Sequence, residues 1–398
     1  MKKEKIVDNM PITEIDIDVT NNCMLNCDYC FRGEKDSRRL SWETGTRAIN
    51  WLIQQSQNKT DLRIAFFGGE PLMEFKLIKK LVPYAEQKAT YYGKRVHFDV
   101  TTNCVLVNNE VIDFFRKHDM KLFASIDGCP ESHDKHRHFP DGSGTSAIIE
   151  PKIRKILKYW PNTSASMSVC NDVVDKWMES VLYLVSLGYR NLTMRLVPEC
   201  EWTDEQLNCL RYELRKISNF YIKRYQTGCP IFIWDIDRVL CKIENPSRSI
   251  KPCEAGRYSV SMKTDGTLYP CHTFGNGLYL DSDDEWRLGS IFEGIDQDKH
   301  NILINFDCIS HSKGDCENCL AVHTCKFPCI ALNWLCSHDI YKPHPNQCKF
   351  NNMYFVEAMR VHYILKSEKN PLFIKGFYSN NEGIKIKNYK QDYRISRS

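Results

Sequence analysis

Residues 12–30 read Ile-Thr-Glu-Ile-Asp-Ile-Asp-Val-Thr-Asn-Asn-Cys-Met-Leu-Asn-Cys-Asp-Tyr-Cys. The first nine of these residues form a β-rich run that predicts a strand over residues 12–20. Cys23, Cys27 and Cys30 follow that strand directly with the spacing C-x3-C-x2-C. In folds built from parallel strands, the loops after the strands carry the chemistry. The sequence therefore predicts a strand that ends in a loop of metal-ligating thiols.

The pattern of strand followed by helix continues to about residue 200. Further β-rich runs lie at residues 62–67, 95–101, 121–126, 164–169 and 191–197. Helical patterns lie between them at residues 41–57, 76–92, 109–118, 146–159 and 173–187. Ser41 is a good N-cap for the first helix and Gly188 a good C-cap for the fifth. Alternating strands and helices predict an α/β fold with a parallel sheet, here a partial (β/α)6 TIM-like barrel, closed by a long helix at 204–226.

Composition excludes several classes of protein. The 398 residues carry 54 basic and 50 acidic side chains, a net charge of +4, so neither a nucleic-acid surface nor a membrane surface is expected. No apolar run approaches the about 18 residues that a membrane helix needs. The N-terminus has no apolar segment of a signal peptide, so we expect a cytoplasmic protein.

Nineteen cysteines are an abnormal number for such a chain. An odd count without an export signal argues against disulfides and for metal binding. Besides the first group, a second group has ligand-like spacing: Cys253, Cys271, Cys316, Cys319, Cys325, Cys329 and Cys348. Nine others show none and are expected to be small buried apolar residues: Cys104, Cys129, Cys170, Cys200, Cys209, Cys229, Cys241, Cys308 and Cys336.

Three thiolates on one short loop suit a [4Fe–4S] cluster that keeps one iron free of protein ligands. A zinc knuckle completed by a distant cysteine is the alternative. The second predicted strand ends in Gly68-Gly69-Glu70, one strand–helix unit after the cysteine loop. Its glycines allow the backbone to approach a ligand closely, and Glu70 can receive an ammonium group.

Together these motifs resemble those of the radical SAM enzymes. The resemblance implies that the three cysteines hold a [4Fe–4S] cluster whose open iron binds S-adenosylmethionine (SAM). It also implies that Gly68, Gly69 and Glu70 lie against the methionine amino group, and that Tyr29 lies near the adenine. One electron from the cluster then cleaves SAM to a 5′-deoxyadenosyl radical.

The resemblance extends to four more positions. Asn103, which ends Thr-Thr-Asn after the third strand, is implied to lie beside SAM. The stretch from Ser125 to Arg137 resembles the S-x-D-G…H-D-x-x-R stretch of anaerobic sulfatase-maturating enzymes, which implies that both residues contact SAM. Leu196 is implied to pack near the adenine. A surface charge at Arg137 and a plain core leucine at 196 are the alternatives.

After about residue 240 the helical periodicity disappears. Bound metal is therefore expected to stabilise the fold of residues 250–349. The seven cysteines resemble the SPASM domain, and a zinc ribbon is the alternative. The resemblance implies two auxiliary [4Fe–4S] clusters. Cys253, Cys271 and Cys329 would hold the nearer one, and Cys316, Cys319, Cys325 and Cys348 the distal one. We expect a radical SAM barrel over 12–230, a SPASM domain over 231–350, and a C-terminal region over 351–398. That last region consists of a helix that spans 350–367 and a polar, basic tail from residue 368.

Two departures from sulfatase-maturating enzymes stand out. Three full sets of ligands need eleven cysteines and the motifs supply ten, because Ser259 stands where those enzymes have a cysteine. The nearer cluster is therefore expected to have an open iron, or to borrow Cys241, Cys308 or a non-thiolate ligand. His272 replaces their basic aspartate, and a histidine also accepts a proton near neutral pH.

These departures favour a peptide maturase that makes an oxidative cross-link such as a thioether. A sulfatase-type maturase that makes formylglycine is the second hypothesis, and a non-catalytic iron–sulfur electron carrier is the third. The expected partners are a peptide or protein substrate and an electron donor of the flavodoxin or ferredoxin type. Only 22 residues precede Cys23, so an N-terminal leader-binding domain is not expected and a separate leader-binding protein would replace it.

Overall fold

The structure is a computed structural model of the whole chain. It describes residues 10–33, 35–244, 253–275, 285–307, 311–314, 316–325 and 329–377. Cys308 and the polar end of the predicted tail, from residue 378, lie outside the described residues.

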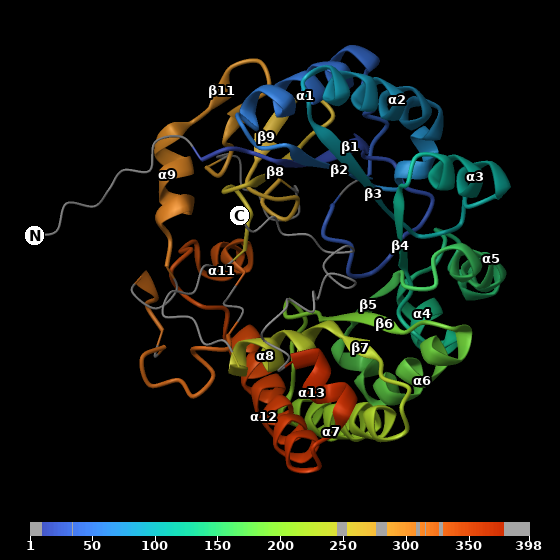
Figure 1. Cartoon of the computed structure of the whole chain (residues 1–398), viewed down its shortest axis with the longest axis vertical. Coiled ribbons are helices and arrows are strands. Elements are labelled where there is room, and N and C mark those ends of the chain that lie inside the picture. The colour runs from blue at the N-terminus through green and yellow to red at the C-terminus, as the bar shows by residue number, and fades with distance from the viewer. Residues whose placement is uncertain are drawn as a thin grey trace, which may run out of the picture.

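Six strands lie side by side in chain order, all parallel, and form the curved sheet at the centre of the molecule (Figure 1). They are β1 (Glu14–Thr20), β2 (Asp61–Gly68), β3 (Arg95–Thr102), β4 (Lys121–Ser125), β5 (Ser164–Val169) and β6 (Asn191–Leu196). A short seventh strand, β7 (Phe232–Ile233), pairs in parallel with β6. The predicted partial barrel is confirmed, and each predicted strand agrees with the observed one to within two residues.

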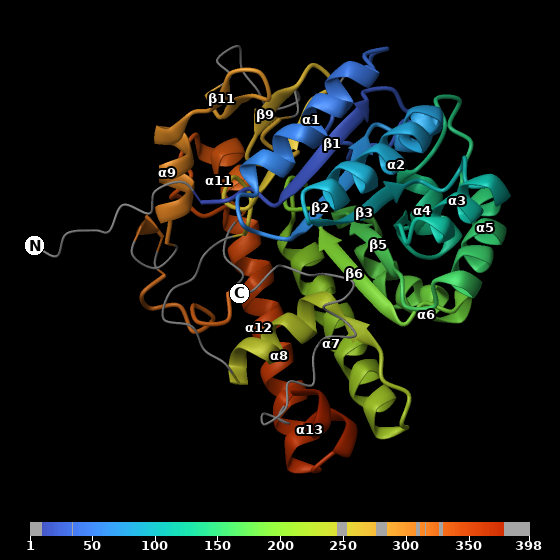
Figure 2. The same cartoon turned by 45° about the horizontal axis from the view of Figure 1, so that its top comes forward.

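Helices connect these strands and cover the outer side of the curved sheet (Figures 1 and 2). They are α1 (Trp42–Gln55), η1 (Pro71–Glu74), α2 (Phe75–Tyr91), α3 (Asn109–Lys117), α4 (Pro130–His136), α5 (Ser146–Tyr159), η2 (Asn171–Lys176), α6 (Trp177–Leu187) and α7 (Asp204–Gln226). Both predicted caps are confirmed. The Ser41 hydroxyl accepts from the Thr44 N–H at 3.0 Å, and Gly188 ends α6 with a φ of 119°.

Strand β1 shows how the barrel separates its two faces. Ile15, Ile17 and Val19 are fully buried in the apolar core with the helices. Asp16 and Asp18 point to the opposite face, because successive side chains of a strand alternate. The interior of the barrel is therefore polar, which suits a site that must bind charged groups.

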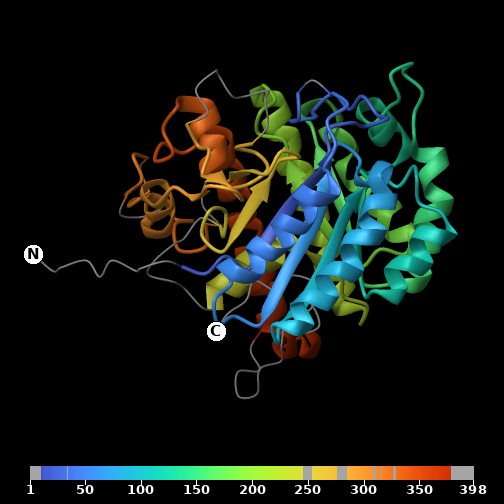
Figure 3. The same cartoon turned by 90° about the horizontal axis from the view of Figure 1, so that it is seen from above.

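The second half of the chain continues the same sheet. Strand β8 (Ser259–Met262) pairs in parallel with β1, and β9 (Thr267–Tyr269), β10 (Gly289–Ser290) and β11 (Gly294–Ile295) follow it in antiparallel order. Figure 3 shows the two halves of the chain side by side. The predicted domain boundaries stay a prediction. A single sheet runs through the barrel and the strands that follow it, from β11 to β7.

The helix expected at 350–367 is confirmed as α12 (Pro345–Ser367). The expectation of no other helical pattern after about residue 240 was wrong for the described residues, which contain the end of α8 (Trp234–Glu244), α9 (Gln297–Asn305), α11 (Ile330–Ser337) and α13 (Pro371–Phe377). Most have only two or three turns, which is too short for a reliable period of 3.6 residues. Helix α12 packs on α7 and α8, and its Glu357 accepts from Arg215 of α7 at 2.7 Å. No described helix is long and apolar enough to cross a membrane.

A buried ion cluster joins the cysteine loop to β1 and to the segment that follows β8. Asp18 of β1 is fully buried and makes a two-pronged ion pair with Arg32, two residues after Cys30, at 2.7 and 3.1 Å. Lys263, just after β8, donates to the same carboxylate at 3.2 Å. Burial alone would raise the pKa of Asp18, but the two cations outweigh it and hold that pKa below its usual value.

We predict that Asp18→Asn lowers the free energy of unfolding by about 3 kcal/mol, because it leaves two buried cations without their counter-charge. Asp113→Asn is the matched control, since that side chain is 71% exposed and its loss should cost less than about 0.5 kcal/mol. Urea denaturation midpoints at pH 7 measure both. Equal shifts for the two variants would contradict the prediction.

Candidate active site

The cysteine loop lies at the carboxyl end of the parallel strands, directly after β1. Cys23, Cys27 and Cys30 are half-buried, and the loop turns where the Cys30 N–H donates to the Cys27 carbonyl at 3.1 Å. The Leu25 N–H donates to the Cys23 sulfur at 3.4 Å. Burial raises the pKa of Cys23 to about 11, so a bound cation is needed to deprotonate it at neutral pH. Three thiols and a backbone N–H aimed at sulfur fit an iron–sulfur cluster.

The two glycines bring the end of β2 against the start of this loop. A Cβ built on Gly69 would overlap the carbonyl oxygen of Asn22, and Gly68 has a φ of +136°. The Gly69 and Glu70 N–H groups donate to the Thr20 and Asn22 carbonyls, each at 2.9 Å. The expected close approach therefore exists within the protein itself, between two backbone segments.

Glu70 is only 1% exposed, and its carboxylate accepts three hydrogen bonds. They come from the Leu72 N–H at 3.0 Å, the Thr102 hydroxyl at 2.7 Å and the Asn103 N–H at 2.8 Å. Burial raises the pKa of Glu70 to about 7, although these hydrogen bonds oppose the rise. Glu70 thus ties the end of β3 to the end of β2, and its contact with an ammonium group stays a prediction.

Asn103 lies beside the first cysteine. Its side-chain amide donates to the Met24 sulfur at 3.2 Å and lies 3.8 Å from the Cys23 sulfur. Two other predicted SAM contacts lie at neighbouring strand ends, with Ser125 half-buried at the end of β4 and Leu196 buried at the end of β6. The carboxyl edge of the sheet therefore carries these side chains around the cysteine loop.

Tyr29 and Arg137 share a carboxylate that the sequence analysis did not assign. The Tyr29 hydroxyl donates to Asp127, which is 3% exposed. Arg137 donates to the same carboxylate through Nε at 2.8 Å and Nη2 at 3.1 Å. Arg137 is therefore largely buried beside the loop, which contradicts its alternative reading as a surface charge.

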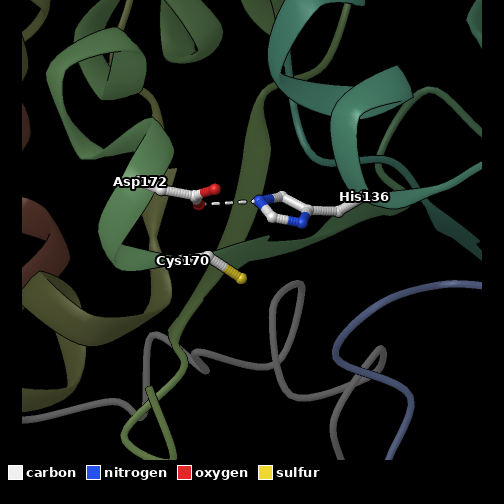
Figure 4. A group of neighbouring side chains, drawn as sticks. All are labelled: His136, Cys170 and Asp172. Atoms are coloured by element: carbon white, nitrogen blue, oxygen red, sulfur yellow. Dashed lines mark hydrogen bonds and ion pairs between the residues drawn. The ribbon is translucent and has the colours of Figure 1, made fainter. Parts of the chain in front are cut away.

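A second set of contacts fastens the loop through Asp28. The Nδ1 atom of His136 lies 3.0 Å from an Asp28 carboxylate oxygen, and its Nε2 atom lies 2.8 Å from an Asp172 carboxylate oxygen. Cys170, at the end of β5, lies within 4.8 Å of the His136 and Asp172 ligand atoms (Figure 4). Because both ring nitrogens already face carboxylates, the His136 side chain links the cysteine loop to η2.

The cysteines of the second half interact in two groups. Burial, together with neighbouring Cys329 and Cys253, raises the pKa of Cys271 to about 12. Burial, together with neighbouring Cys325, Cys316 and Cys319, raises the pKa of Cys348 to about 12. The assignment of each set to one auxiliary cluster stays a prediction.

The two departures from sulfatase-maturating enzymes lie beside the barrel interior. Ser259 is half-buried in β8 and pairs with Glu14 of β1. The Nδ1 atom of His272 is 3.7 Å from an Asp16 carboxylate oxygen. Its ring centroid is 4.8 Å from that of Phe67 and 5.4 Å from that of Phe31, next to Cys30.

A parallel partial barrel with a three-cysteine loop at its carboxyl edge defines a class of iron–sulfur enzymes, and comparison with known proteins identifies the family. Residues 17–208 match the model of the radical SAM superfamily. An uncharacterised protein of Methanocaldococcus jannaschii is 30% identical over 221 residues, which cover 52% of this chain and 73% of that protein. The chain belongs to the radical SAM superfamily, whose members bind a [4Fe–4S] cluster and SAM, and it is an enzyme.

Two further comparisons extend beyond the barrel. A cysteine-type anaerobic sulfatase-maturating enzyme of Clostridium novyi is 24% identical over 333 residues, which cover 78% of this chain and 85% of that enzyme. The structure of native anSMEcpe with bound AdoMet and the Cp18Cys peptide has a TM-score of 0.75 at 18% identity, covering 90% of this chain and all of that one. The fold of this chain, including the part that follows the barrel, matches that of anSMEcpe.

We predict that Gly69→Ala abolishes cluster loading on the cysteine loop, because its Cβ meets backbone that cannot move aside. Iron content after anaerobic reconstitution should fall by about four atoms per chain, the number in one such cluster. Gly376→Ala is the control, since a Cβ there meets nothing within 4 Å. Full iron loading of Gly69→Ala would refute the prediction.

His133 provides a pH test of the segment behind Asp127. Its Nδ1 accepts from the Asp127 N–H at 3.2 Å and its Nε2 lies 2.9 Å from the Thr145 hydroxyl. Burial lowers the pKa of His133 to about 4.

As pH falls from 7 to 5, the unfolded chain binds a proton at His133 that the folded chain does not. We expect wild type to lose about 2 kcal/mol of stability over this range relative to His133→Gln. Urea denaturation at pH 5, 6 and 7 measures it, and identical pH profiles would contradict it.

Proposed function

We propose that this radical SAM enzyme of the maturase type modifies a peptide or protein and forms an oxidative cross-link, specifically a thioether. The set of seven SPASM-like cysteines carries the proposal, because it provides for two auxiliary clusters beside the barrel. Ser259 leaves one ligand position without a cysteine, where a substrate thiolate could bind iron. The missing cysteine ligand is inferred from the resemblance to sulfatase-maturating enzymes. An open ligand position that can bind a thiolate favours C–S bond formation.

The chain's own residues would bind and orient the reactants. Gly68, Gly69 and Asn103 lie against the cysteine loop, where the methionine end of SAM is proposed to bind. When bound, the cluster supplies the electron that cleaves SAM to a 5′-deoxyadenosyl radical. Arg137 offers a buried cation for the SAM carboxylate.

Forming a thioether removes a hydrogen atom, a proton and an electron from the substrate. The hydrogen atom would go to 5′-deoxyadenosine, the thiol proton to a base, and the electron to an auxiliary cluster held by the second group of cysteines. His272 is the proposed base, because its imidazole faces the barrel interior between Phe31 and Phe67. Asp16 lies close enough to its Nδ1 to orient the ring.

Formylglycine formation by a sulfatase-type maturase is the second candidate. The Clostridium novyi relative supports it over 85% of its length, and the peptide-bound anSMEcpe structure supports a peptide substrate of either kind. Ser259 and His272 are what favour the cross-link. Membership in the radical SAM superfamily excludes the third hypothesis, a non-catalytic iron–sulfur electron carrier. A donor of the flavodoxin or ferredoxin type and a separate leader-binding protein complete the proposal.

One experiment separates the two candidates. The reduced protein is incubated without oxygen with SAM and a cysteine-containing sulfatase-motif peptide, and mass spectrometry follows both products. The proposal predicts 5′-deoxyadenosine with no formylglycine. Loss of sulfur and gain of an aldehyde in the peptide would establish formylglycine formation and contradict the cross-link.

We predict that Cys348→Ala still cleaves SAM at no less than about one third of the wild-type rate but modifies no peptide, because Cys348 is proposed to hold the distal auxiliary cluster. Its iron content should fall by up to about four atoms per chain. Cys336→Ala is the matched control and should keep both activities. Cys336 lies outside the motif and is exposed, as is Cys229, so the expectation that both are buried was wrong. Peptide modification by Cys348→Ala at the wild-type rate would contradict the assignment.

A further inference from the structure

We propose that Asp127 is a positioning residue that sets the geometry of SAM binding by holding Tyr29 and Arg137 on one carboxylate. The inference rests on the proposed function, since it takes those two side chains as SAM contacts. Asp127 lies just after β4 at the carboxyl edge of the sheet and is buried, so it acts through its neighbours.

Four donors from three separate segments meet at this carboxylate. The Tyr29 hydroxyl and the Arg137 Nε donate to Oδ2, and the Arg137 Nη2 and the Ser168 N–H donate to Oδ1. Tyr29 belongs to the cysteine loop, Arg137 follows α4, and Ser168 lies in β5. One side chain thus fixes the loop between Cys27 and Cys30 relative to two neighbouring strand ends.

The charge on Asp127 is necessary for this arrangement. An ionised carboxylate only accepts hydrogen bonds, so it can serve all four donors at once. Burial alone would raise the pKa of Asp127, but Arg137 and the other donors outweigh it and keep it below the usual value. An asparagine has an NH2 group in place of one of these oxygens, and that group would face two of the four donors, which would lose their acceptor in a buried place.

Arg137 keeps donors for a ligand. Asp127 accepts from the Nε and Nη2 side of its planar guanidinium. Within the part of the chain that the structure describes, the Arg137 side chain makes no other hydrogen bond. Its central carbon lies 5.3 Å from the Tyr29 ring centroid, so the cation also rests on the aromatic face. The guanidinium is therefore held in one orientation, with its remaining N–H groups directed by Asp127.

Asp127→Asn tests this role against Asp134→Asn. Asp134 lies on α4, seven residues after Asp127, and accepts from the Thr145 and Ser146 N–H groups, each at 2.7 Å, without a hydrogen bond to Tyr29 or Arg137. The anaerobically reconstituted full chain is titrated with SAM, and the change in the EPR spectrum of the reduced cluster gives the Kd. We expect Asp127→Asn to weaken SAM binding about tenfold or more, and Asp134→Asn to change it less than about twofold even where it lowers stability.

A double-mutant cycle shows whether Asp127 acts through Arg137. Arg137→Lys is introduced alone and together with Asp127→Asn. If Asp127 positions Arg137, the double variant binds SAM little worse than Arg137→Lys alone. Additive losses, or equal SAM affinities for Asp127→Asn and Asp134→Asn, would overturn the inference.

Tyr29→Phe covers the case in which Asp127→Asn does not take up iron. It removes only the hydroxyl that donates to Asp127, and we expect about threefold weaker SAM binding at full iron content. Unchanged binding by Tyr29→Phe in that case would overturn the inference. A wild-type protein whose EPR spectrum does not respond to SAM would contradict the proposed function itself, whereas a responding wild type with unaffected variants contradicts only the role of Asp127.

Discussion

Buried carboxylates at the ends of three strands hold the cysteine loop, and the site depends on them. Asp18 of β1 binds Arg32, Glu70 after β2 binds the end of β3, and Asp127 after β4 binds Tyr29. Each is at most 3% exposed and each accepts hydrogen bonds, as buried polar groups must. A loop without regular secondary structure is thereby held in place for three thiols that must bind one cluster.

The sequence predicted the elements well and their long-range partners poorly. The six parallel strands, the Ser41 cap and the Gly188 cap follow from local pattern and spacing. Asp127 was quoted within a motif but not assigned, because its partner Tyr29 is 98 positions away and no local rule couples the two. The pairing of β8 with β1 was missed for the same reason, since residues 259–262 carry too short a pattern to show that they extend the barrel sheet.

The two maturase reactions differ at few positions of a shared scaffold. The barrel, the loop and the two groups of cysteines serve either reaction, and Ser259 and His272 are where this chain departs from the sulfatase type. The His272 ring lies near that of Phe67 and its Nδ1 is 3.7 Å from an Asp16 oxygen, where we propose that it serves as the base. Ser259 is proposed to leave one ligand position open to a substrate thiolate.

SAM is proposed to coordinate the iron that the cysteine loop leaves open, and electron–nuclear double resonance measures this coordination. The reduced protein is mixed with SAM labelled with ¹⁷O in the carboxylate and ¹⁵N in the amino group. Hyperfine coupling from both labels is expected if SAM coordinates this iron directly. A spectrum without coupling from either label, at a SAM concentration that saturates binding, would contradict the proposed coordination.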